Sequence, residues 1–311
     1  MNFLEVVRFP VEWDILEWFY KIGCTFLDYF FYLISEFGSS IAVILIVTLI
    51  YWCISKEKGK QIALICFFGV CFNNVLKASF NALRPFEYSN KGYLRKLDGR
   101  NLSDGASGTS FPSGHSQNSA TLFSSIFGCF KNKIVRIICI ALIILIPISR
   151  LYLGVHFPGD ILIGVLCGIL TTVIFSYLFN KYPNKILLIA LISLLIIIPF
   201  IFLPNIRKDL FKGLGLLSGG IVGIYVEEKY INFKISKVKK VNILRYLCGI
   251  IVTGITYGLI HVINHLEFIE NYNFLLFLSN YLTHMGLCLV GVVIVPYLFK
   301  KIPFLKGEDD E

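Results

Sequence analysis

Long runs of apolar residues alternate with short polar connections from residue 37 onward. Each run has about 17 to 25 residues, the length that an α-helix needs to cross ~30 Å of hydrocarbon. Hydrophobic residues make up 56% of the 311 residues and the mean hydropathy is +0.73, which is more apolar surface than a soluble chain can bury. The pattern predicts an all-α, polytopic transmembrane bundle with about nine spans, at residues 37–55, 62–82, 114–130, 135–153, 158–179, 185–204, 210–226, 244–264 and 273–299.

Residues 1–36 depart from this pattern, because charged side chains interrupt their apolar positions at Glu12, Asp14, Glu17, Lys21 and Asp28. A charge at the midplane of a bilayer is costly, so we expect amphipathic helices that lie in the outer interface. A tenth crossing, with the N-terminus inside, is the alternative. The expected domains are the interfacial segment 1–36, a catalytic transmembrane core at 37–204 and a transmembrane extension at 205–311.

Basic residues produce the net charge of +9, and they are spread over the polar connections instead of forming one patch. Alternate connections carry more than half of the 29 lysines and arginines, at residues 56–60, 131–136, 181–185, 229–245 and 300–306. The positive-inside rule places these connections in the cytoplasm. We therefore expect a multi-pass protein of the plasma membrane whose partner is the bilayer, with no nucleic-acid partner.

The nine cysteines mostly fall inside or at the edges of the apolar runs, where they act as small hydrophobic residues. No pair has the spacing of a metal site or looks like a disulfide framework. His261 and His265 are four residues apart, a spacing that can indicate a metal site, but no carboxylate shares it. We therefore interpret them as part of a water-exposed face at the outer interface. The sequence predicts no metal and no cofactor.

Three polar clusters carry candidate chemistry, and on this topology all three lie at the outer ends of helices, where they can meet at one depth. They are Lys77 with Arg84-Pro85, then Pro112-Ser113-Gly114-His115, and then Ser149-Arg150 with His156 and Asp160. The connection at residues 85–112 is long and rich in Gly, Ser, Asn and charge. Loops of this length commonly act as lids or binding loops, and a flexible linker is the alternative.

Lys77 and Arg84 are seven residues apart, which puts both on one face of a helix that should end near Pro85. Two cations would then project from one helix end. Taken singly, Lys77 can also be a lysine that snorkels to the interface, and Arg84 can be an interfacial anchor.

Ser113 is a good N-cap for the next helix, and Gly114 lets backbone N–H groups approach a ligand. A helix N-terminus is suited to bind phosphate, because it offers unpaired donors and the positive end of a dipole. His115 in that first turn can protonate a leaving oxygen. An ordinary N-cap followed by an interfacial histidine is the alternative.

Pro158 suits the first position of a helix, so Asp160 falls in the first turn and can reach back toward His156. A carboxylate on one ring nitrogen of His156 fixes the tautomer and leaves the other nitrogen as a nucleophile. Arg150, at the end of the preceding helix, can grip two phosphate oxygens with its fork. The alternative is an interfacial arginine and an aspartate that caps a helix.

At every fixed position the clusters resemble the signature of the type 2 phosphatidic acid phosphatase (PAP2) superfamily, Lys-x6-Arg-Pro, Pro-Ser-Gly-His and Ser-Arg-x5-His-x3-Asp. The likeness covers about residues 37–180, and residues 210–300 are more loosely similar to a C-terminal extension of some bacterial members. The resemblance implies that His156 is the nucleophile, that Asp160 orients it and that His115 is the acid. It also implies a metal-free phosphate site made of Lys77, Arg84, Ser113, Gly114 and Arg150.

The expected function is therefore that of a membrane phosphatase that hydrolyses a phosphomonoester or diphosphate of a lipid through a phosphohistidine, at an extracytoplasmic active site. Undecaprenyl diphosphate, phosphatidic acid and phosphatidylglycerophosphate all fit a basic site that opens to the bilayer. A lipid phosphotransferase with the same site is the first alternative. A membrane transporter is a more distant one, because the strongly polar residues gather at one interface and not at mid-helix depth.

Overall fold

The computed structural model describes residues 8–88, 96–97, 100–101 and 108–307, which fold as two compact units. The first unit contains the residues up to 43, then 72–176 and 203–205, and the second contains 44–71, 177–202 and the residues from 206 onward. Each unit combines stretches that are distant in sequence, whereas the domain boundaries expected near residues 36 and 204 follow chain order. That division stays a prediction.

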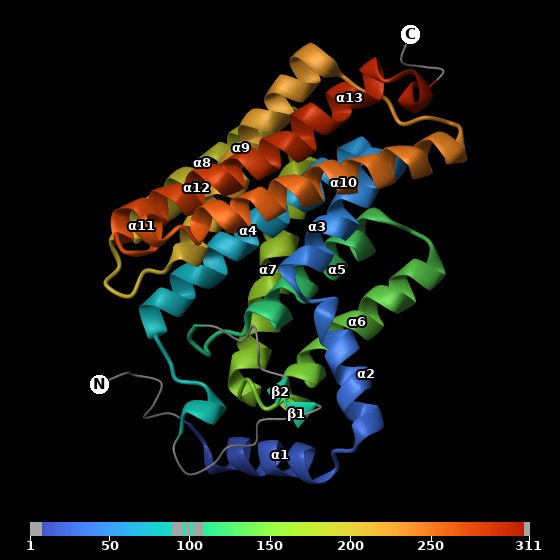
Figure 1. The fold of residues 1–311 in the computed structure, drawn as a ribbon. Coiled ribbons are helices and arrows are strands. Elements are labelled where there is room, and N and C mark those ends of the chain that lie inside the picture. The colour runs from blue at the N-terminus through green and yellow to red at the C-terminus, as the bar shows by residue number, and fades with distance from the viewer. Residues whose placement is uncertain (1–7, 89–95, 98–99, 102–107, 308–311) are drawn as a thin grey trace. The chain divides into compact units, whose positions relative to one another are not determined.

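The first unit consists mainly of helices (Figure 1). They are α1 (Pro10–Lys21), α2 (Thr25–Glu36), the end of α4 (Lys56–Phe80), α5 (Gly114–Cys129), α6 (Lys133–Tyr152) and most of α7 (Pro158–Lys181). Between α4 and α5 the chain forms a 3-10 turn at Pro85–Glu87 and two short antiparallel strands, β1 (Lys96–Leu97) and β2 (Arg100–Asn101). The rest of the expected lid, at residues 89–95, 98–99 and 102–107, lies outside the described residues.

The second unit is also helical. It contains most of α3 (Ser40–Leu49), the start of α4, then α8 (Ile186–Ile197), α9 (Lys208–Val226), α10 (Lys239–Asn264), α11 (Glu267–Glu270), α12 (Asn273–Leu289) and α13 (Val295–Lys301). Three π-helical segments extend these helices, at Ile50–Ile54, Glu227–Ile231 and Val290–Ile294, and 3-10 turns lie at Pro183–Lys185, Ile198–Phe202 and Pro303–Leu305. The predicted all-α, polytopic class is confirmed.

Among the described residues, seven helices are long and apolar enough to cross a membrane, and an eighth span arises if the bent pair Thr25–Glu36 and Ser40–Ile54 counts as one. The count of nine is therefore not confirmed. One difference is α5, which has only 16 residues where ~20 are needed to span hydrocarbon. The other is the span predicted at 37–55, because the helical stretch Ser40–Ile54 is long enough only together with α2, from which it is bent by 55°.

The N-terminal segment forms two helices of 12 residues each, α1 and α2, whose placement in the interface stays a prediction. Two of the charges that interrupt its apolar pattern, Glu12 and Asp28, are buried against the protein. Tyr152 at the end of α6 donates a hydrogen bond to Oδ1 of Asp28 at 2.5 Å. These carboxylates therefore dock the segment onto the rest of the first unit.

Close packing of α5 on α7 aligns their N-terminal ends in the first unit. A Cβ atom at Gly164 would lie 2.7 Å from the carbonyl oxygen of Ser113, and one at Gly168 would lie 2.6 Å from that of Gln117. Farther along, the Ser124 hydroxyl donates to Oγ1 of Thr172 at 2.9 Å. Because α7 contributes no side chain at these two positions, the first turn of α5 reaches the first turn of α7.

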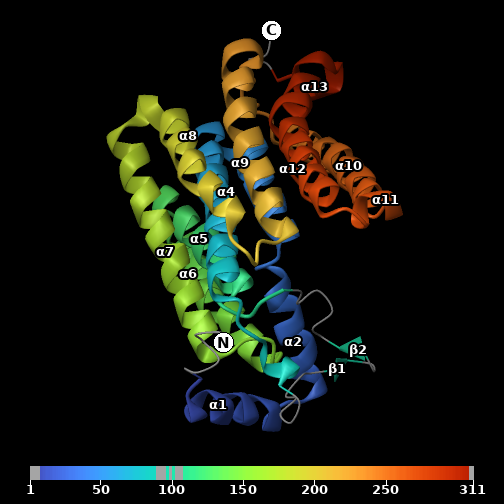
Figure 2. The ribbon, with the colours of Figure 1, turned by 90° about the vertical axis from the view of Figure 1, so that its left-hand side faces the viewer.

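In the second unit α9 and α12 lie side by side (Figures 1 and 2). Glycines on α9 make this approach possible. A Cβ atom at Gly215 would lie 2.3 Å from the carbonyl oxygen of Tyr281, and one at Gly219 would lie 2.7 Å from that of Met285. Small residues let the backbones of membrane helices come this close, which increases the van der Waals contact that holds them together.

Several basic residues that the sequence assigns to the cytoplasmic side also have structural partners in the second unit. Lys56 pairs with Glu227 at 2.7 Å, and Lys60 pairs with Glu228 at 2.6 Å. Arg245 is fully buried and donates to the carbonyl oxygens of Lys234 at 2.7 Å and Leu305 at 2.8 Å. These connections therefore stabilise the helix ends, besides the role in topology that the sequence predicts for them.

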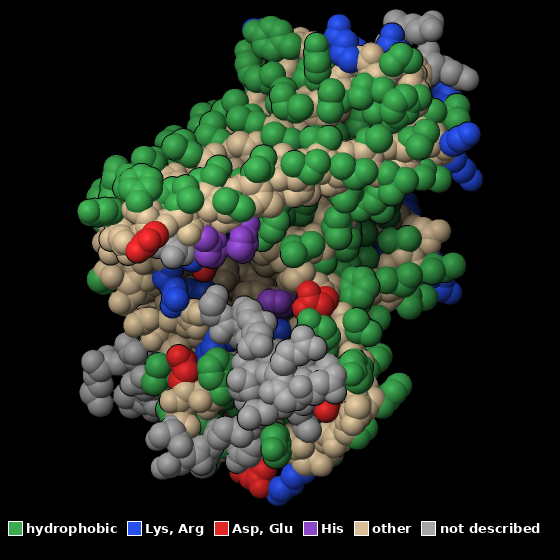
Figure 3. Space-filling view, viewed as in Figure 1, with side chains coloured by type: hydrophobic (Ala, Val, Ile, Leu, Met, Phe, Trp, Pro, Cys, Tyr) green, Lys and Arg blue, Asp and Glu red, His purple; other side chains and the backbone are tan. Residues whose placement is uncertain are grey.

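Apolar side chains cover the outer face of α10 in the space-filling view (Figure 3). They follow a four-residue spacing and are exposed at Ile243, Leu247, Ile251, Ile255 and Leu259. An exposed apolar stripe of this length is costly in water and stable against lipid. The stripe fits the multi-span membrane character of the chain.

We predict that Gly215→Ala destabilises the second unit, because the new methyl group must push α9 away from α12. Overpacking of this kind costs about 1–3 kcal/mol, so the purified protein should unfold at a lower temperature in detergent. Gly254→Ala on α10 is the matched control, since nothing lies within 4 Å of a Cβ atom there. Equal unfolding temperatures for the two variants would contradict the packing argument.

Candidate active site

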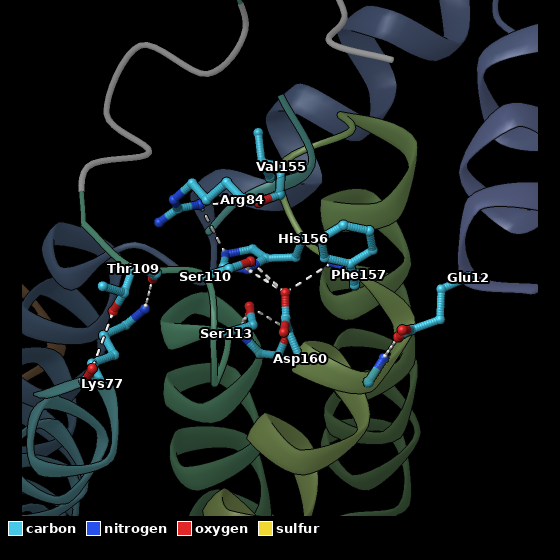
Figure 4. A network of polar contacts seen from close by, with 12 residues as sticks. Glu12, Lys77, Arg84, Thr109, Ser110, Ser113, Val155, His156, Phe157 and Asp160 are labelled. Atoms are coloured by element: carbon cyan, nitrogen blue, oxygen red, sulfur yellow. Dashed lines mark hydrogen bonds and ion pairs between the residues drawn. The ribbon is translucent and has the colours of Figure 1, made fainter. Parts of the chain in front are cut away.

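Four helix ends of the first unit carry the predicted side chains of one polar centre, and Figure 4 shows those of α4, α5 and α7 through Lys77, Ser113 and Asp160. Lys77 lies in the last turn of α4, Ser113 caps α5, Arg150 lies in the last turn of α6 and Asp160 lies in the first turn of α7. Buried charged groups require hydrogen bonds or opposite charges as partners. The ionisable side chains that are buried here are Arg84, Arg150, His156 and Asp160, with exposed fractions of 4%, 5%, 2% and 0%.

A tight turn after α6 delivers His156 to this centre. Gly154 adopts φ = 71°, a left-handed conformation that favours glycine. The amide of Val155 donates to the carbonyl oxygen of Arg150 at 3.2 Å, and that of Gly154 donates to Leu151 at 2.9 Å. This is the hydrogen-bond pattern of a Schellman C-cap, which ends α6 and holds His156 between α6 and α7.

The start of α7 fixes Asp160. Pro158 is the first helical residue, as predicted. Oδ2 of Asp160 accepts a hydrogen bond from the amide of Phe157 at 2.9 Å, so the carboxylate caps its own helix. Ser110 Oγ donates to the same oxygen, and Nδ1 of His156 lies 3.5 Å from it. Oδ2 is therefore fixed against the histidine ring.

The contacts of His156 define its tautomer. Nη1 of Arg84 lies 3.2 Å from Nε2 of His156. Because a guanidinium has only donors, Nε2 is the acceptor and carries the lone pair. The proton is then on Nδ1, which faces Asp160 and lies 3.4 Å from Ser110 Oγ. The ring thus presents Nε2, the nitrogen on the side away from the carboxylate, as the nucleophilic atom.

The electrostatic surroundings keep the ring of His156 neutral. Burial lowers its pKa well below the ordinary value of 6.5, and the Arg84 cation lowers it further, while Asp160 acts in the opposite direction. A pKa below 6.5 means that the ring is unprotonated at neutral pH. Nε2 therefore carries a lone pair and no proton, and this lone pair faces the guanidinium of Arg84.

Arg84 lies in an extended stretch after α4, whereas the sequence predicted it on the helix itself. The helix α4 ends at Phe80, and Asn81 has φ = 44°, a left-handed conformation that stops a helix. Pro85 then holds Arg84 in an extended conformation with φ = −85° and ψ = 158°. The prediction that Lys77 and Arg84 share one helix face is therefore wrong.

Lys77 and Arg84 nevertheless converge on one stretch of chain before α5. Nζ of Lys77 donates to the carbonyl oxygen of Thr109, and Nε of Arg84 donates to that of Gly108 at 2.8 Å. Oγ1 of Thr109 lies 3.4 Å from the carbonyl oxygen of Lys77. The two cations therefore hold the stretch that brings Ser110 to Asp160.

The first turn of α5 has the predicted N-cap. Oγ of Ser113 accepts a hydrogen bond from the amide of Ser116 at 3.4 Å, and the amide of Ser113 donates to the carbonyl oxygen of Asp160 at 3.0 Å. A Cβ atom at Gly114 would meet one described atom within 4 Å, Oδ1 of Asn73 at 3.4 Å. Among the described residues, Asn73 is therefore the neighbour that a side chain at Gly114 would meet first.

His115 and Arg150 complete the group. Burial lowers the pKa of His115 well below the ordinary value of 6.5, and the nearby charges of Arg150, His156, Arg84 and Lys77 lower it further. Nη1 of Arg150 donates to Oγ of Ser35 in α2 at 2.5 Å. All eight predicted site residues thus belong to the first unit and surround one centre, while their individual roles stay predictions.

Some side chains that the sequence analysis did not assign to the site also lie at it. Arg8 and Ser110 bind Asp160, Ser35 accepts a hydrogen bond from Arg150, and Glu12 binds the amide of Gly159 at the start of α7. Ser110 stands two residues before Pro112, next to the second motif but outside its fixed positions. Arg8 and Glu12 belong to a segment without any motif. Their four-residue spacing is the one signal that could have linked them, because such residues can pair on one face.

His261 and His265, in the second unit, stack with their ring centroids 4.2 Å apart and are exposed. Nδ1 of His265 lies 2.8 Å from the carbonyl oxygen of His261. Within the part of the chain that the structure describes, no three His, Cys, Asp or Glu side chains form a group that could hold a metal.

The arrangement in the first unit is suited to bind a tetrahedral oxyanion. Arg84 lies at the nucleophilic nitrogen of His156, and Lys77 and Arg150 add two more cations. The N-terminus of α5 adds backbone donors and the positive end of a helix dipole. Among the predicted residues these cations face a single carboxylate, Asp160, so the centre has an excess of positive charge for an anionic group.

Two family models match the chain. The model described as PAP2 superfamily matches residues 58–184 and so includes all three polar clusters. The model described as PAP2 superfamily phosphatase, transmembrane extension, matches residues 211–307. Together they span both the region of the polar centre and the C-terminal helices.

Individual relatives are more distant. The chain is 43% identical over 70 residues to phosphatidylglycerophosphatase B of Bacillus subtilis, which covers 20% of this chain and 34% of that protein. This match therefore spans about a third of the length of that relative. The present chain is also 26% identical over 187 residues to lipid A 4'-phosphatase of Bacteroides thetaiotaomicron. That alignment covers 57% of this chain and 80% of the relative. The crystal structure of Aquifex aeolicus LpxE aligns with a TM-score of 0.47 at 24% identity, over 55% of this chain and 97% of that one.

We predict that His156 remains neutral on acidification to below pH 6.5, because burial and Arg84 lower its pKa. A pH titration of the protein in detergent with ¹⁵N-labelled histidine, followed by NMR, measures this directly. The chain has five histidines, so the signal lost in His156→Asn identifies the ring. Protonation of His156 at or above pH 6.5 would contradict the electrostatic account.

Proposed function

Because the chain belongs to the PAP2 superfamily, we propose that it is a membrane lipid phosphatase that works through a phosphohistidine on His156. The observation that carries the proposal is the contact chain from Arg84 through His156 to Asp160. It combines an anion-binding cation, a neutral imidazole with its lone pair on Nε2, and a carboxylate on the opposite nitrogen. Phosphoryl transfer to nitrogen requires all three.

In the proposed first step, Nε2 of His156 forms a bond to phosphorus while the bond from phosphorus to the lipid oxygen breaks. The electron pair leaves with that oxygen, which takes a proton from His115. Because burial and the surrounding cations lower the pKa of His115, the negative charge of the bound phosphate must hold this proton on the ring. The imidazolium that develops on His156 is stabilised by Asp160 through Nδ1. In the second step water attacks the phosphohistidine, His115 accepts the proton of that water, and the cleavage of the N–P bond releases inorganic phosphate.

Five groups are proposed to stabilise the negative charge that develops on the phosphoryl oxygens. They are the side chains of Lys77, Arg84, Arg150 and Ser113 and the backbone at Gly114. Donors that are already in place where charge develops stabilise the transition state, and the loss of one should cost ~10²–10³ in turnover. The contacts of Lys77, Arg84 and Arg150 with Thr109, Gly108 and Ser35 support this assignment, because they hold each cation before substrate arrives.

The proposed substrate is a phosphomonoester or diphosphate of a lipid, in line with the lipid phosphatases to which the chain is similar. Undecaprenyl diphosphate, phosphatidic acid and phosphatidylglycerophosphate are candidates. The distribution of basic residues supports an extracytoplasmic site in the plasma membrane. On the predicted topology the polar clusters lie at the helix ends opposite the connections that carry most of the lysines and arginines. The same site would serve a lipid phosphotransferase, with a second lipid in place of water.

We predict that His156→Ala abolishes turnover while the protein still folds and inserts. Brief incubation of the wild type with ³²P-labelled lipid phosphate, quenched at alkaline pH, should trap label on the protein, and His156→Ala should trap none. His265→Ala, which removes an exposed histidine, is the matched control and should behave as the wild type. Normal activity of His156→Ala would refute the nucleophile assignment.

We also predict that chelators leave the activity intact, because Lys77, Arg84 and Arg150 neutralise the phosphate charge without a metal. Phosphate release from the three candidate lipids, with and without EDTA, measures this and identifies the preferred substrate in one experiment. A strict requirement for Mg²⁺ would contradict the metal-free mechanism. Transfer of label to a second lipid in place of phosphate release would identify a phosphotransferase.

A further inference from the structure

The N-terminus of α7 is capped by a residue from α1. The amide of Gly159, at the second helical position, has no partner within its own helix. It donates to Oε1 of Glu12 at 2.9 Å, while Oε2 of Glu12 accepts from the amide of Phe9 at 3.2 Å. A Cβ atom at Gly159 would lie only 3.0 Å from Oε1 of Glu12. Thus α1 is docked on the helix end that carries Asp160.

This docking brings Arg8 to the carboxylate of Asp160. Nη2 of Arg8 donates to Oδ1 of Asp160 at 2.9 Å, and the two side chains are 9% and 0% exposed. The guanidinium carbon lies 4.0 Å from the ring centroid of Phe157, and Trp13 packs edge-on against the same ring at 4.9 Å. Stacking on an aromatic face limits the positions available to the guanidinium.

The two oxygens of Asp160 therefore have different partners. Oδ2 accepts from Ser110 and from the amide of Phe157 and faces Nδ1 of His156, whereas Oδ1 is bound by Arg8. The bond at Oδ1 prevents the carboxylate from rotating about its side-chain axis. Among the groups that contact Asp160, Arg8 carries the permanent positive charge, and such a charge keeps a fully buried carboxylate ionised.

We propose that Arg8 is a positioning residue of the active site, which fixes the rotation and the negative charge of Asp160 and thereby holds His156 in its Nδ1-protonated tautomer. The inference rests on the proposed function and extends it to a segment that carries none of the three motifs. In this arrangement Glu12 holds α1 on the N-terminus of α7. The docked helix in turn places Arg8, two residues before it, at the carboxylate of Asp160.

The test compares kinetic constants of purified full-length variants in detergent. Arg8→Gln should lower kcat by about 10- to 100-fold, because a misaligned histidine attacks less efficiently. KM should stay nearly unchanged, because Arg8 binds Asp160 and not the phosphate. Arg8→Lys, which keeps the charge, should recover most of kcat. Lys21→Gln removes an exposed cation of the same segment and should match the wild type.

A double-mutant cycle separates action through Asp160 from a general effect on folding. In an Asp160→Asn background the carboxylate that Arg8 positions is gone, so Arg8→Gln should add almost nothing to the loss of kcat. Two independent effects would instead multiply. If Arg8→Gln does not fold, Arg8→Lys takes its place in the same cycle, with a smaller single effect that should again vanish in the Asp160→Asn background.

The outcomes distinguish this inference from the proposed function. A wild-type protein that releases no phosphate from any candidate lipid would overturn the proposed function itself. An active wild type with inactive His156→Ala, together with wild-type kcat for Arg8→Gln, would overturn only the inference. Multiplicative losses in the cycle, or an Arg8→Lys variant no more active than Arg8→Gln, would also overturn it.

Discussion

The buried carboxylate of Asp160 constrains the rest of the polar centre. A fully buried anion is stable only with several donors, and Asp160 obtains them from distant parts of the chain: Arg8, Ser110, and Phe157 with His156. Each donor needs its own backbone geometry. The Schellman turn at Gly154 sets the place of His156, the cations hold the stretch with Ser110, and the residues just before α1 supply Arg8. The centre is therefore one network, in which each of these segments supplies a donor that the buried carboxylate needs.

The same network explains why family membership and chemistry agree. The PAP2 superfamily model covers the stretch that supplies Lys77, Arg84, His115, His156 and Asp160. Their mutual contacts give one ring nitrogen to a carboxylate and the other to a cation. An imidazole in that setting is neutral and has a defined tautomer, which is the state that phosphoryl transfer to nitrogen needs. The short approach of α5 to α7 adds a helix N-terminus to the same place.

Sequence reasoning was most successful where chemistry is local. Ser113 caps α5 and Pro158 begins α7 because both preferences depend on a few neighbouring atoms. It failed where a single backbone dihedral mattered: Asn81 turns left-handed and ends α4, so Arg84 arrives in extended conformation. The nine predicted spans exceed the seven or eight candidate spans among the described residues, because α5 is short and because α2 and α3 are bent relative to each other. Arg8 and Glu12 were missed because their partners lie about 150 residues away along the chain, a separation that no local pattern encodes.

The central claim is that Nε2 of His156 attacks a phosphorus held by the surrounding cations. An experimental structure with vanadate bound tests it most directly, because vanadate adopts the trigonal geometry of the transferring phosphoryl group. The account predicts vanadium within bonding distance of Nε2, with Arg84 on its equatorial oxygens and Asp160 still on Nδ1. Vanadate bound to another residue, or attached to Nδ1 with Asp160 displaced, would contradict it.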